Sequence, residues 1–114
     1  MGSFSIGPAD VGSTLVAAPI TSNGSTVAAV AGTTGTIIRV YKIFFTVAGA
    51  TTLTFEDGST ALSGAVNFAA AAGPVILPMD GQPWFTCGRG NTFNIANSGS
   101  VQISGTIYYT QTVF

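Results

Sequence analysis

Side chains that can transfer a proton, attack a bond or hold a metal ion are scarce in this chain. Its 114 residues include no histidine, one cysteine, three basic residues and four acidic residues. Histidine is the usual proton carrier near neutral pH, and no two of the available groups have the spacing of a catalytic or metal-binding motif. The sequence therefore predicts a protein that packs, binds or assembles, and not an enzyme. The available groups are Asp10, Arg39, Lys42, Glu56, Asp57, Asp80, Cys87 and Arg89.

Two short segments come closest to a chemical signature, and each has a simpler explanation. Segment 56–59, Glu-Asp-Gly-Ser, offers oxygen ligands to a hard cation, but calcium takes about six to eight oxygens and Asp10 and Asp80 are distant in sequence. A hairpin turn at its Asp-Gly pair explains this segment better. Segment 88–91, Gly-Arg-Gly-Asn, has the glycines of a phosphate-binding loop without the lysine and the following helix, and is better explained as a tight turn. We therefore expect no metal and no cofactor.

Trp84, the only tryptophan, is placed where an aromatic ring could contact a ligand. It follows a predicted turn at residues 79–83, so its ring would lie at an edge of the fold. An exposed aromatic ring beside asparagine or glutamine is a common platform for a sugar ring, and one hypothesis is that Trp84 contacts a glycan. The alternative, which we favour, is that Trp84 packs against one end of the fold or against a neighbouring subunit.

Low charge and high hydrophobicity restrict the partners of the chain. Charged residues make up 6% of it, against about 25% in typical soluble domains, and its mean hydropathy is +0.53. Three basic side chains are too few to neutralise a nucleic-acid backbone. The most apolar stretch, 37–50, contains Arg39 and Lys42 and is too short to span a bilayer, and residues 1–5 lack the features of a signal peptide. We therefore expect no nucleic-acid partner and no membrane partner.

The same composition favours association. A net charge of −1 gives a small domain little electrostatic protection against self-contact, so we expect stable oligomers or a larger assembly. The alternative is a monomer whose surface is covered by threonine and serine. Cys87 has no partner for an internal disulfide, and we expect it to be a small buried apolar residue.

Apolar and polar residues alternate with a period of two along much of the chain, whereas helix patterns are nearly absent. The clearest predicted strand is 101–110, in which Gly105 is expected to form a bulge or bend. Residues 52–56 alternate as well and lead into Asp57-Gly58, a strong hairpin signal. Short strands separated by Gly, Pro, Asn or Asp turns are typical of antiparallel sandwiches. We therefore predict an all-β antiparallel sandwich of jelly-roll type.

The first part of the chain is richer in turn-forming and small residues than the rest. Gly7-Pro8, Pro19 and Asn23-Gly24 divide it into short pieces rich in Ala, Ser and Thr. One interpretation is an extended N-terminal arm, residues 1–31, that pairs with a neighbour's sheet edge and precedes a sandwich domain at residues 32–114. The other interpretation, equally compatible with the sequence, is that these residues form the first strand pair of the same sandwich.

Segment 36–47 is apolar on both of its predicted faces. Strict alternation places Ile38, Val40 and Phe44 on one face. The opposite face consists of Ile37, Tyr41, Ile43, Phe45 and Val47. A central strand of a sandwich needs only one apolar face, so we expect the second face to contact another subunit. The predicted interface residues are Tyr41, Ile43, Phe45 and the last residue, Phe114.

Several runs of the chain resemble small proteins encoded among the structural genes of tailed bacteriophages. The early runs are Val27–Gly32, Ile37–Val40 and Leu53–Gly64. The later ones are Phe68 with the Ala/Gly stretch after it, Val75–Pro78, Pro83–Phe85, and a Val-x-Ile-x-Gly-x-Ile-x-Tyr strand at 101–109. The resemblance covers residues 25–110.

This resemblance implies a virion component on the exterior of a phage capsid. Proteins of this kind are small β-sandwiches that decorate or cement the shell, commonly as homotrimers that clamp neighbouring major capsid subunits. It therefore implies the major capsid protein and further copies of the chain as partners, with burial of apolar surface as the mechanism. No binding residue is carried over, because the contacts of the family lie in no fixed motif. The alternative is a tail or head-fibre module that binds a host-surface glycan through Trp84.

Overall fold

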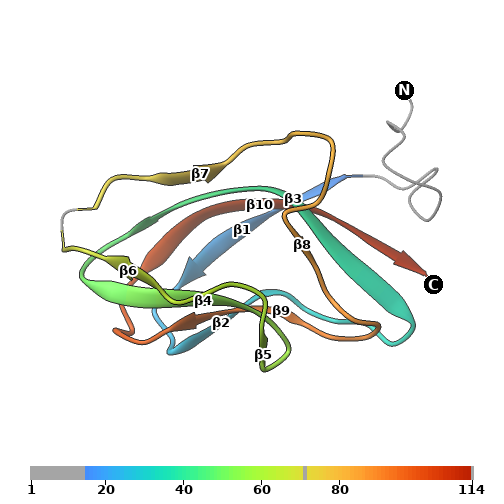
Figure 1. The fold of residues 1–114 in the computed structure, drawn as a ribbon, viewed down its shortest axis with the longest axis horizontal. Helices are drawn as coiled ribbons and strands as arrows, with labels where there is room; N and C mark the ends of the chain where they lie inside the picture. The colour runs from blue at the N-terminus through green and yellow to red at the C-terminus, as the bar shows by residue number, and fades with distance from the viewer. Residues whose placement is uncertain (1–14, 71, 114) are drawn as a thin grey trace.

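The computed structural model describes residues 15–70 and 72–113, which form two antiparallel β-sheets packed face to face (Figure 1). The all-β antiparallel sandwich predicted from the sequence is confirmed. These residues form no helix, and so none that is long and apolar enough to cross a membrane. Sheet A contains β1 (Val16–Ser22), β10 (Ile103–Val113), β3 (Thr36–Val47), β7 (Val75–Leu77) and β8 (Phe85–Thr86). Sheet B contains β2 (Thr26–Val30), β9 (Phe93–Asn97), β4 (Thr51–Asp57), β5 (Thr60–Ala61) and β6 (Val66–Phe68).

The strands pair like a long hairpin that is folded back across both sheets. β1 pairs with β10, β2 with β9, β3 with β7 and β8, and β4 with β5 and β6. In addition β10 pairs with β3, and β9 pairs with β4, which gives the sheet orders β1-β10-β3-β7 and β2-β9-β4-β5. Successive strands from β1 to β4 therefore alternate between the two sheets, and β1 and β10, the first and last strands of the described residues, lie side by side.

The strands β1 and β2 are integral parts of the sandwich. β1 pairs with β10 over its whole length, from Val16 opposite Tyr109 to Ser22 opposite Ile103, and β2 pairs with β9. The expected N-terminal arm is therefore wrong for residues 16–30, which belong to the same sandwich and supply one strand to each of its two sheets. Residues 1–14 lie outside the described part of the chain.

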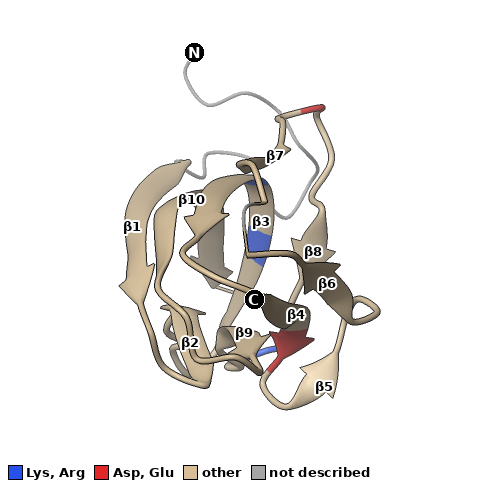
Figure 2. Ribbon diagram, turned by 90° about the vertical axis from the view of Figure 1, so that its left-hand side faces the viewer, with Lys and Arg blue, Asp and Glu red and all other residues tan. Residues whose placement is uncertain are grey.

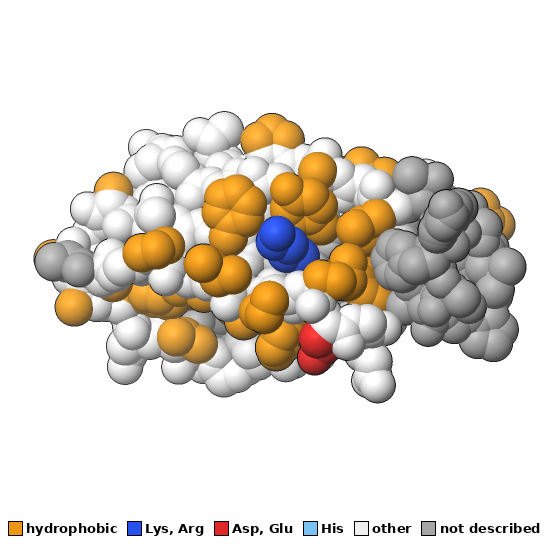
Figure 3. Space-filling view, turned by 90° about the horizontal axis from the view of Figure 1, so that it is seen from above, with side chains coloured by type: hydrophobic (Ala, Val, Ile, Leu, Met, Phe, Trp, Pro, Cys, Tyr) orange, Lys and Arg blue, Asp and Glu red, His pale blue; other side chains and the backbone are white. Residues whose placement is uncertain are grey.

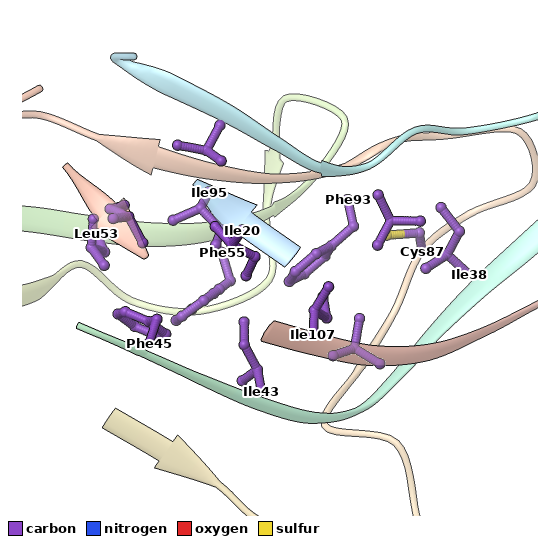
Figure 4. Packing of buried hydrophobic residues seen from close by; sticks show 14 of the residues in the cluster. Ile20, Ile38, Ile43, Phe45, Leu53, Phe55, Cys87, Phe93, Ile95 and Ile107 are labelled. Atoms are coloured by element: carbon purple, nitrogen blue, oxygen red, sulfur yellow. The ribbon is translucent and has the colours of Figure 1, made fainter. Parts of the chain in front are cut away.

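The core lies between the two sheets and is built from alternate residues of both (Figure 4). Phe55 of sheet B is central to it, because its ring centroid is 4.9 Å from that of Phe85, 6.1 Å from that of Phe93 and 6.3 Å from that of Phe45. Cys87 is only 2% exposed, which confirms the prediction that it is a small buried residue. Each fully buried aliphatic or aromatic side chain stabilises the fold by about 1.5–3 kcal/mol.

Strand β3 has one core face instead of the two that strict alternation predicts. Lys42 lies opposite Tyr108 of β10 and Val40 lies opposite Tyr109, so Tyr41 is an extra residue in a β-bulge. The bulge shifts the alternation by one residue. As a result, Ile38 and Val40 before the bulge and Ile43, Phe45 and Val47 after it all face the same core.

The predicted pairing of Phe44 with Ile38 and Val40 on one face is consequently wrong. Phe44 points away from the core and is 38% exposed, whereas its neighbour Phe45 is 1% exposed. The apparent second apolar face of segment 36–47 arose because the sequence pattern was continued through a bulge. Segment 36–47 therefore does not require a subunit on its far side in order to bury its apolar residues.

A candidate interaction surface on the outer face of sheet A

The described residues show no arrangement typical of a catalytic or metal centre. They contain no group of three or more His, Cys, Asp or Glu side chains that could hold a metal ion. Asp57-Gly58 forms the predicted hairpin, in which Asp57 pairs with Thr60 and Gly58 has φ of 62°. Residues 88–91 form the predicted tight turn, in which Gly90 has φ of 79° and the Asn91 N–H donates to the Gly88 carbonyl oxygen (3.1 Å).

The thiol of Cys87 is poorly suited to nucleophilic chemistry. Its burial and, to a smaller extent, the negative charge of Asp57 raise the pKa of Cys87 to about 12. The thiolate is the reactive form, and the thiol remains protonated at neutral pH. The nearby Asp57 carboxylate is occupied in part by the fold, since its Oδ2 accepts a hydrogen bond from the Gly88 N–H at 3.0 Å.

The outer face of sheet A presents exposed apolar side chains around a basic residue. The register aligns Phe44 of β3 with Ile76 of β7, and both side chains point away from the core, with 38% and 60% of their surface exposed. In the adjacent row, Lys42 of β3 lies opposite Tyr108 of β10. Figure 3 looks onto this side of the molecule, where hydrophobic side chains gather around a basic group.

Lys42 and Tyr108 interact directly on this face. The Lys42 ammonium lies 5.1 Å from the centroid of the Tyr108 ring, within the range of a cation–π contact. This contact holds the positive charge against the sheet and beside the Phe44 and Ile76 row. The aliphatic stem of Lys42 adds to the apolar area of the face, while its ammonium supplies the charge.

Trp84 completes the same face at the edge near β7 and β8. Its indole is 41% exposed, and the indole Nε1–H donates to the Pro78 carbonyl oxygen at 2.8 Å. Pro78 follows Leu77, which pairs with Ile43, so the indole lies close to the part of β3 that contains Lys42. The hydrogen bond fixes the orientation of the ring. We call Lys42, Phe44, Ile76, Trp84 and Tyr108 the outer-face patch.

Most of the residues predicted to form a subunit interface do not lie on a surface. Ile43 and Phe45 belong to the core cluster and are 0% and 1% exposed, and Tyr41 at the bulge is 0% exposed. These three residues are buried in the single chain, so the prediction that they contact another subunit is corrected by their position. Phe114 lies outside the described residues. Trp84, in contrast, is exposed and belongs to the outer-face patch.

The sequence reasoning missed Phe44 and Ile76. Phe44 was assigned to a core face because the bulge at Tyr41 has no local sequence signal: it is defined by the pairing of β3 with β10. Ile76 was given no role in the sequence analysis, although a three-residue strand between two prolines is typical of a sheet edge, where a side chain is readily exposed.

Comparison of the chain with protein-family models, with curated proteins and with solved structures gives no match.

Proposed function

We propose that this chain is a structural protein of a phage virion that decorates and stabilises the capsid from outside. It acts without catalysis, by burying apolar surface against the major capsid protein and against further copies of itself. The outer-face patch is the observation that supports this proposal most strongly. Phe44, Ile76 and Trp84 are each more than a third exposed on one face, and clustered apolar exposure of this kind marks interaction sites.

The strand connectivity also supports the proposal. Nested pairing of β1 with β10, β2 with β9, β3 with β7 and β8, and β4 with β5 and β6 is the connectivity expected of a jelly roll. Jelly rolls are common in viral capsid proteins and in lectins. The fold by itself implies no function, but this connectivity agrees with the resemblance of residues 25–110 to virion proteins.

A reconstitution experiment tests the proposal. Capsid shells that lack this chain are mixed with the purified protein, and binding is measured by co-sedimentation together with the temperature at which the shells disassemble. We expect saturable binding and a higher disassembly temperature. Ile76→Ser is expected to weaken binding, while Val113→Ser, at an aliphatic residue 86% exposed at the end of β10, serves as the matched control. Absence of binding by the unmodified protein would refute the proposal.

A second candidate function is recognition of a host-surface glycan by Trp84. The specific observation in its favour is an exposed indole whose orientation is fixed by the hydrogen bond to Pro78. Lys42 nearby would favour a sugar with a carboxylate, and Gln82, whose N–H donates to Asp80 Oδ1 at 3.3 Å, lies in the same loop. An aromatic ring face of this kind stacks on the C–H groups of a pyranose.

Trp84→Ala and Trp84→Phe separate this second function from the first. Glycan binding through ring stacking predicts loss of binding with alanine and partial retention with phenylalanine, measured on immobilised host polysaccharides. Thermal unfolding of both variants is the control for folding. Equal glycan binding by all three proteins, or none by any of them, rejects the glycan hypothesis and leaves capsid decoration unaffected.

A further inference from the structure

Asn23 and Gly24 form the only Asn-Gly pair in the sequence, and both lie in the turn between β1 and β2. Figure 2 shows β1 and β2 at the same side of the sandwich, where this turn leads from one sheet to the other. Asn23 is exposed, Gly24 is partly exposed, and neither residue belongs to a strand. The pair is therefore open to water and lies outside the hydrogen-bond ladders that hold the strands rigid.

An Asn-Gly pair in an accessible turn can lose ammonia without an enzyme. The backbone nitrogen of the glycine attacks the asparagine Cγ, a new N–Cγ bond closes a succinimide ring, and the Cγ–Nδ2 bond breaks. The side-chain nitrogen leaves as ammonia, with the proton that the glycine nitrogen gives up. Water then opens the ring at either carbonyl carbon, which yields aspartate or its β-linked isomer, isoaspartate. Glycine favours the attack because it has no side chain to shield its nitrogen.

The other four asparagines of the chain are less suited to this reaction. Asn97 is 0% exposed and its amide is held by hydrogen bonds at both its oxygen and its nitrogen. Asn67 lies in β6, where its Oδ1 accepts a hydrogen bond from the Thr52 hydroxyl at 2.8 Å. Each of the four also precedes a residue whose side chain shields the attacking nitrogen, namely Phe68, Thr92, Ile95 or Ser98. Sequence and exposure therefore single out Asn23.

One hydrogen bond restrains the attacking nitrogen in the folded chain. The Gly24 N–H donates to the Ser22 Oγ at 3.1 Å. While this bond is formed, the nitrogen keeps its proton and is less available to the Cγ of Asn23. Ser22 is partly exposed at the end of β1, so this bond opens to water without separation of any strands. The reaction therefore proceeds from the folded chain, at a rate that depends on one hydrogen bond.

We propose that Asn23 is a site of spontaneous deamidation in the folded protein and that the Ser22 hydroxyl slows the reaction. Water is the second reactant, and the products are ammonia and a carboxylate at residue 23. The change adds a negative charge to segment 11–38, which contains no charged residue. The reaction is a property of the chain alone and is independent of the proposed function.

The isoaspartate product would disturb the buried hydrogen bonds of Asn97. The Gly24 carbonyl oxygen accepts from Asn97 Nδ2 at 3.1 Å, and the Ser25 carbonyl oxygen accepts from the Asn97 N–H at 2.8 Å. In isoaspartate the main chain runs through the β carbon, which lengthens it just before Gly24 and displaces both carbonyl groups. Aspartate keeps the normal main chain. We therefore expect isoaspartate chains to unfold at a lower denaturant concentration than aspartate chains.

Peptide mapping by mass spectrometry tests the proposal. The folded full-length chain is incubated in mildly alkaline buffer, and the conversion of amide to acid is followed in each asparagine-containing peptide. We expect the peptide with Asn23 to react first and to contain isoaspartate, while the peptides with the other asparagines stay unchanged. Ser22→Ala is expected to raise the rate by roughly two- to tenfold, which is the factor that one hydrogen bond contributes to an opening equilibrium.

Two further variants are matched controls for this turn. Ser22→Thr keeps a hydroxyl at the same position and is expected to retain the slow rate of the unmodified chain. Gly24→Ala adds a Cβ to the attacking residue, 3.3 Å from the Thr26 carbonyl oxygen, and is expected to slow the reaction. Thermal unfolding of every variant shows whether a faster rate arises from the released nitrogen or from an opened fold.

Three outcomes would contradict the proposal. If residue 23 reacts in denaturant but stays unchanged in the folded chain, the turn is not a deamidation site. Equal rates for Ser22→Ala and the unmodified chain would remove the restraint assigned to Ser22. Deamidated chains are separated by ion exchange, and equal denaturant midpoints for the isoaspartate fraction and for Asn23→Asp would show that the longer main chain leaves the Asn97 hydrogen bonds intact.

Discussion

Asn97 and Thr51 form a buried polar pair that joins two turns and the start of β4 at one end of the sandwich. The Thr51 hydroxyl donates to Asn97 Oδ1 at 2.6 Å and accepts from the Gly99 N–H at 2.9 Å. The Asn97 Nδ2 donates to the carbonyl oxygens of Gly24 (3.1 Å) and Val101 (2.8 Å). The pair therefore connects the β1–β2 turn, the start of β4 and the β9–β10 turn, and satisfies backbone groups that the turns leave unpaired.

Replacement of Asn97 by leucine is expected to destabilise the fold by about 2–4 kcal/mol, because the Thr51 hydroxyl and two turn carbonyls lose partners in a buried site. Asn97 is 0% exposed, so water cannot take over these hydrogen bonds without opening the turns. Denaturant unfolding measures the change. Ser98→Ala, at an exposed position of the same turn, is the control, with an expected loss below about 1 kcal/mol. Equal losses in both variants would contradict the role assigned to Asn97.

Gly105 is required because β10 and β3 approach closely at this residue. A Cβ atom at position 105 would overlap the Phe44 carbonyl oxygen and lie 2.6 Å from the Phe45 Cα. Gly105→Ala is therefore expected to destabilise the protein by about 2 kcal/mol or more, since two central strands would have to separate. Thermal unfolding measures this loss of stability. The matched control is Gly64→Ala, because no atom lies within 4 Å of a Cβ added at that site. Similar unfolding temperatures for the two variants would show that the strands adjust without cost.

Cys87 gives the fold a pH dependence in the alkaline range. Its burial raises the pKa from 9.0 to about 12 in the folded chain. The unfolded chain therefore loses this proton first, so the contribution of Cys87 to stability is complete below pH 9 and decreases as the pH rises toward 12. Urea unfolding of the unmodified protein and of Cys87→Ala across this range isolates the contribution, because the two proteins differ only at residue 87. We expect a steeper alkaline decline with Cys87 present, and parallel curves would refute the assignment.

The same burial predicts slow reaction with thiol reagents. Ellman's reagent reacts with thiolates, so Cys87 should react only when the chain opens, and the rate at neutral pH should rise sharply in denaturant. Rapid and complete labelling of the native protein would show that the thiol is accessible and ionised.

The sequence predicted the parts of this fold that depend on local chemistry. The hairpin at Asp57-Gly58, the tight turn at residues 88–91 and the burial of Cys87 follow from residue types and spacing, and the structure confirms them. A bulge was also expected on β10 at Gly105, but Gly105 instead permits close packing, and the bulge lies at Tyr41 on β3. Which strand accommodates an extra residue is decided by pairing between distant segments, and that information is absent from a single strand.

The candidate site was harder to predict for the same reason. Alternation gave the correct spacing within each half of segment 36–47, but the shift at Tyr41 exchanged the faces of its second half. Ile43 and Phe45 moved from a predicted interface into the core, and Phe44 moved from the core to the surface. A surface patch is defined by register across several strands, and Phe44, Ile76 and Tyr108 are brought together from three of them.

Neighbouring phenylalanines on β3 give the sharpest test of this exchange. Phe45→Ala is expected to cost about 3–5 kcal/mol, because Phe45 is 1% exposed and packs against Phe55 and Phe68. Phe44→Ala is expected to cost less than about 1 kcal/mol in the monomer, because Phe44 is on the outer face. Denaturant unfolding at low protein concentration compares the two substitutions, which have identical chemistry and adjacent positions. Without the bulge at Tyr41, alternation from Ile38 and Val40 would bury Phe44 and expose Phe45. A larger loss of stability in Phe44→Ala than in Phe45→Ala would therefore show that β3 is continuous and that the outer-face patch is wrongly placed.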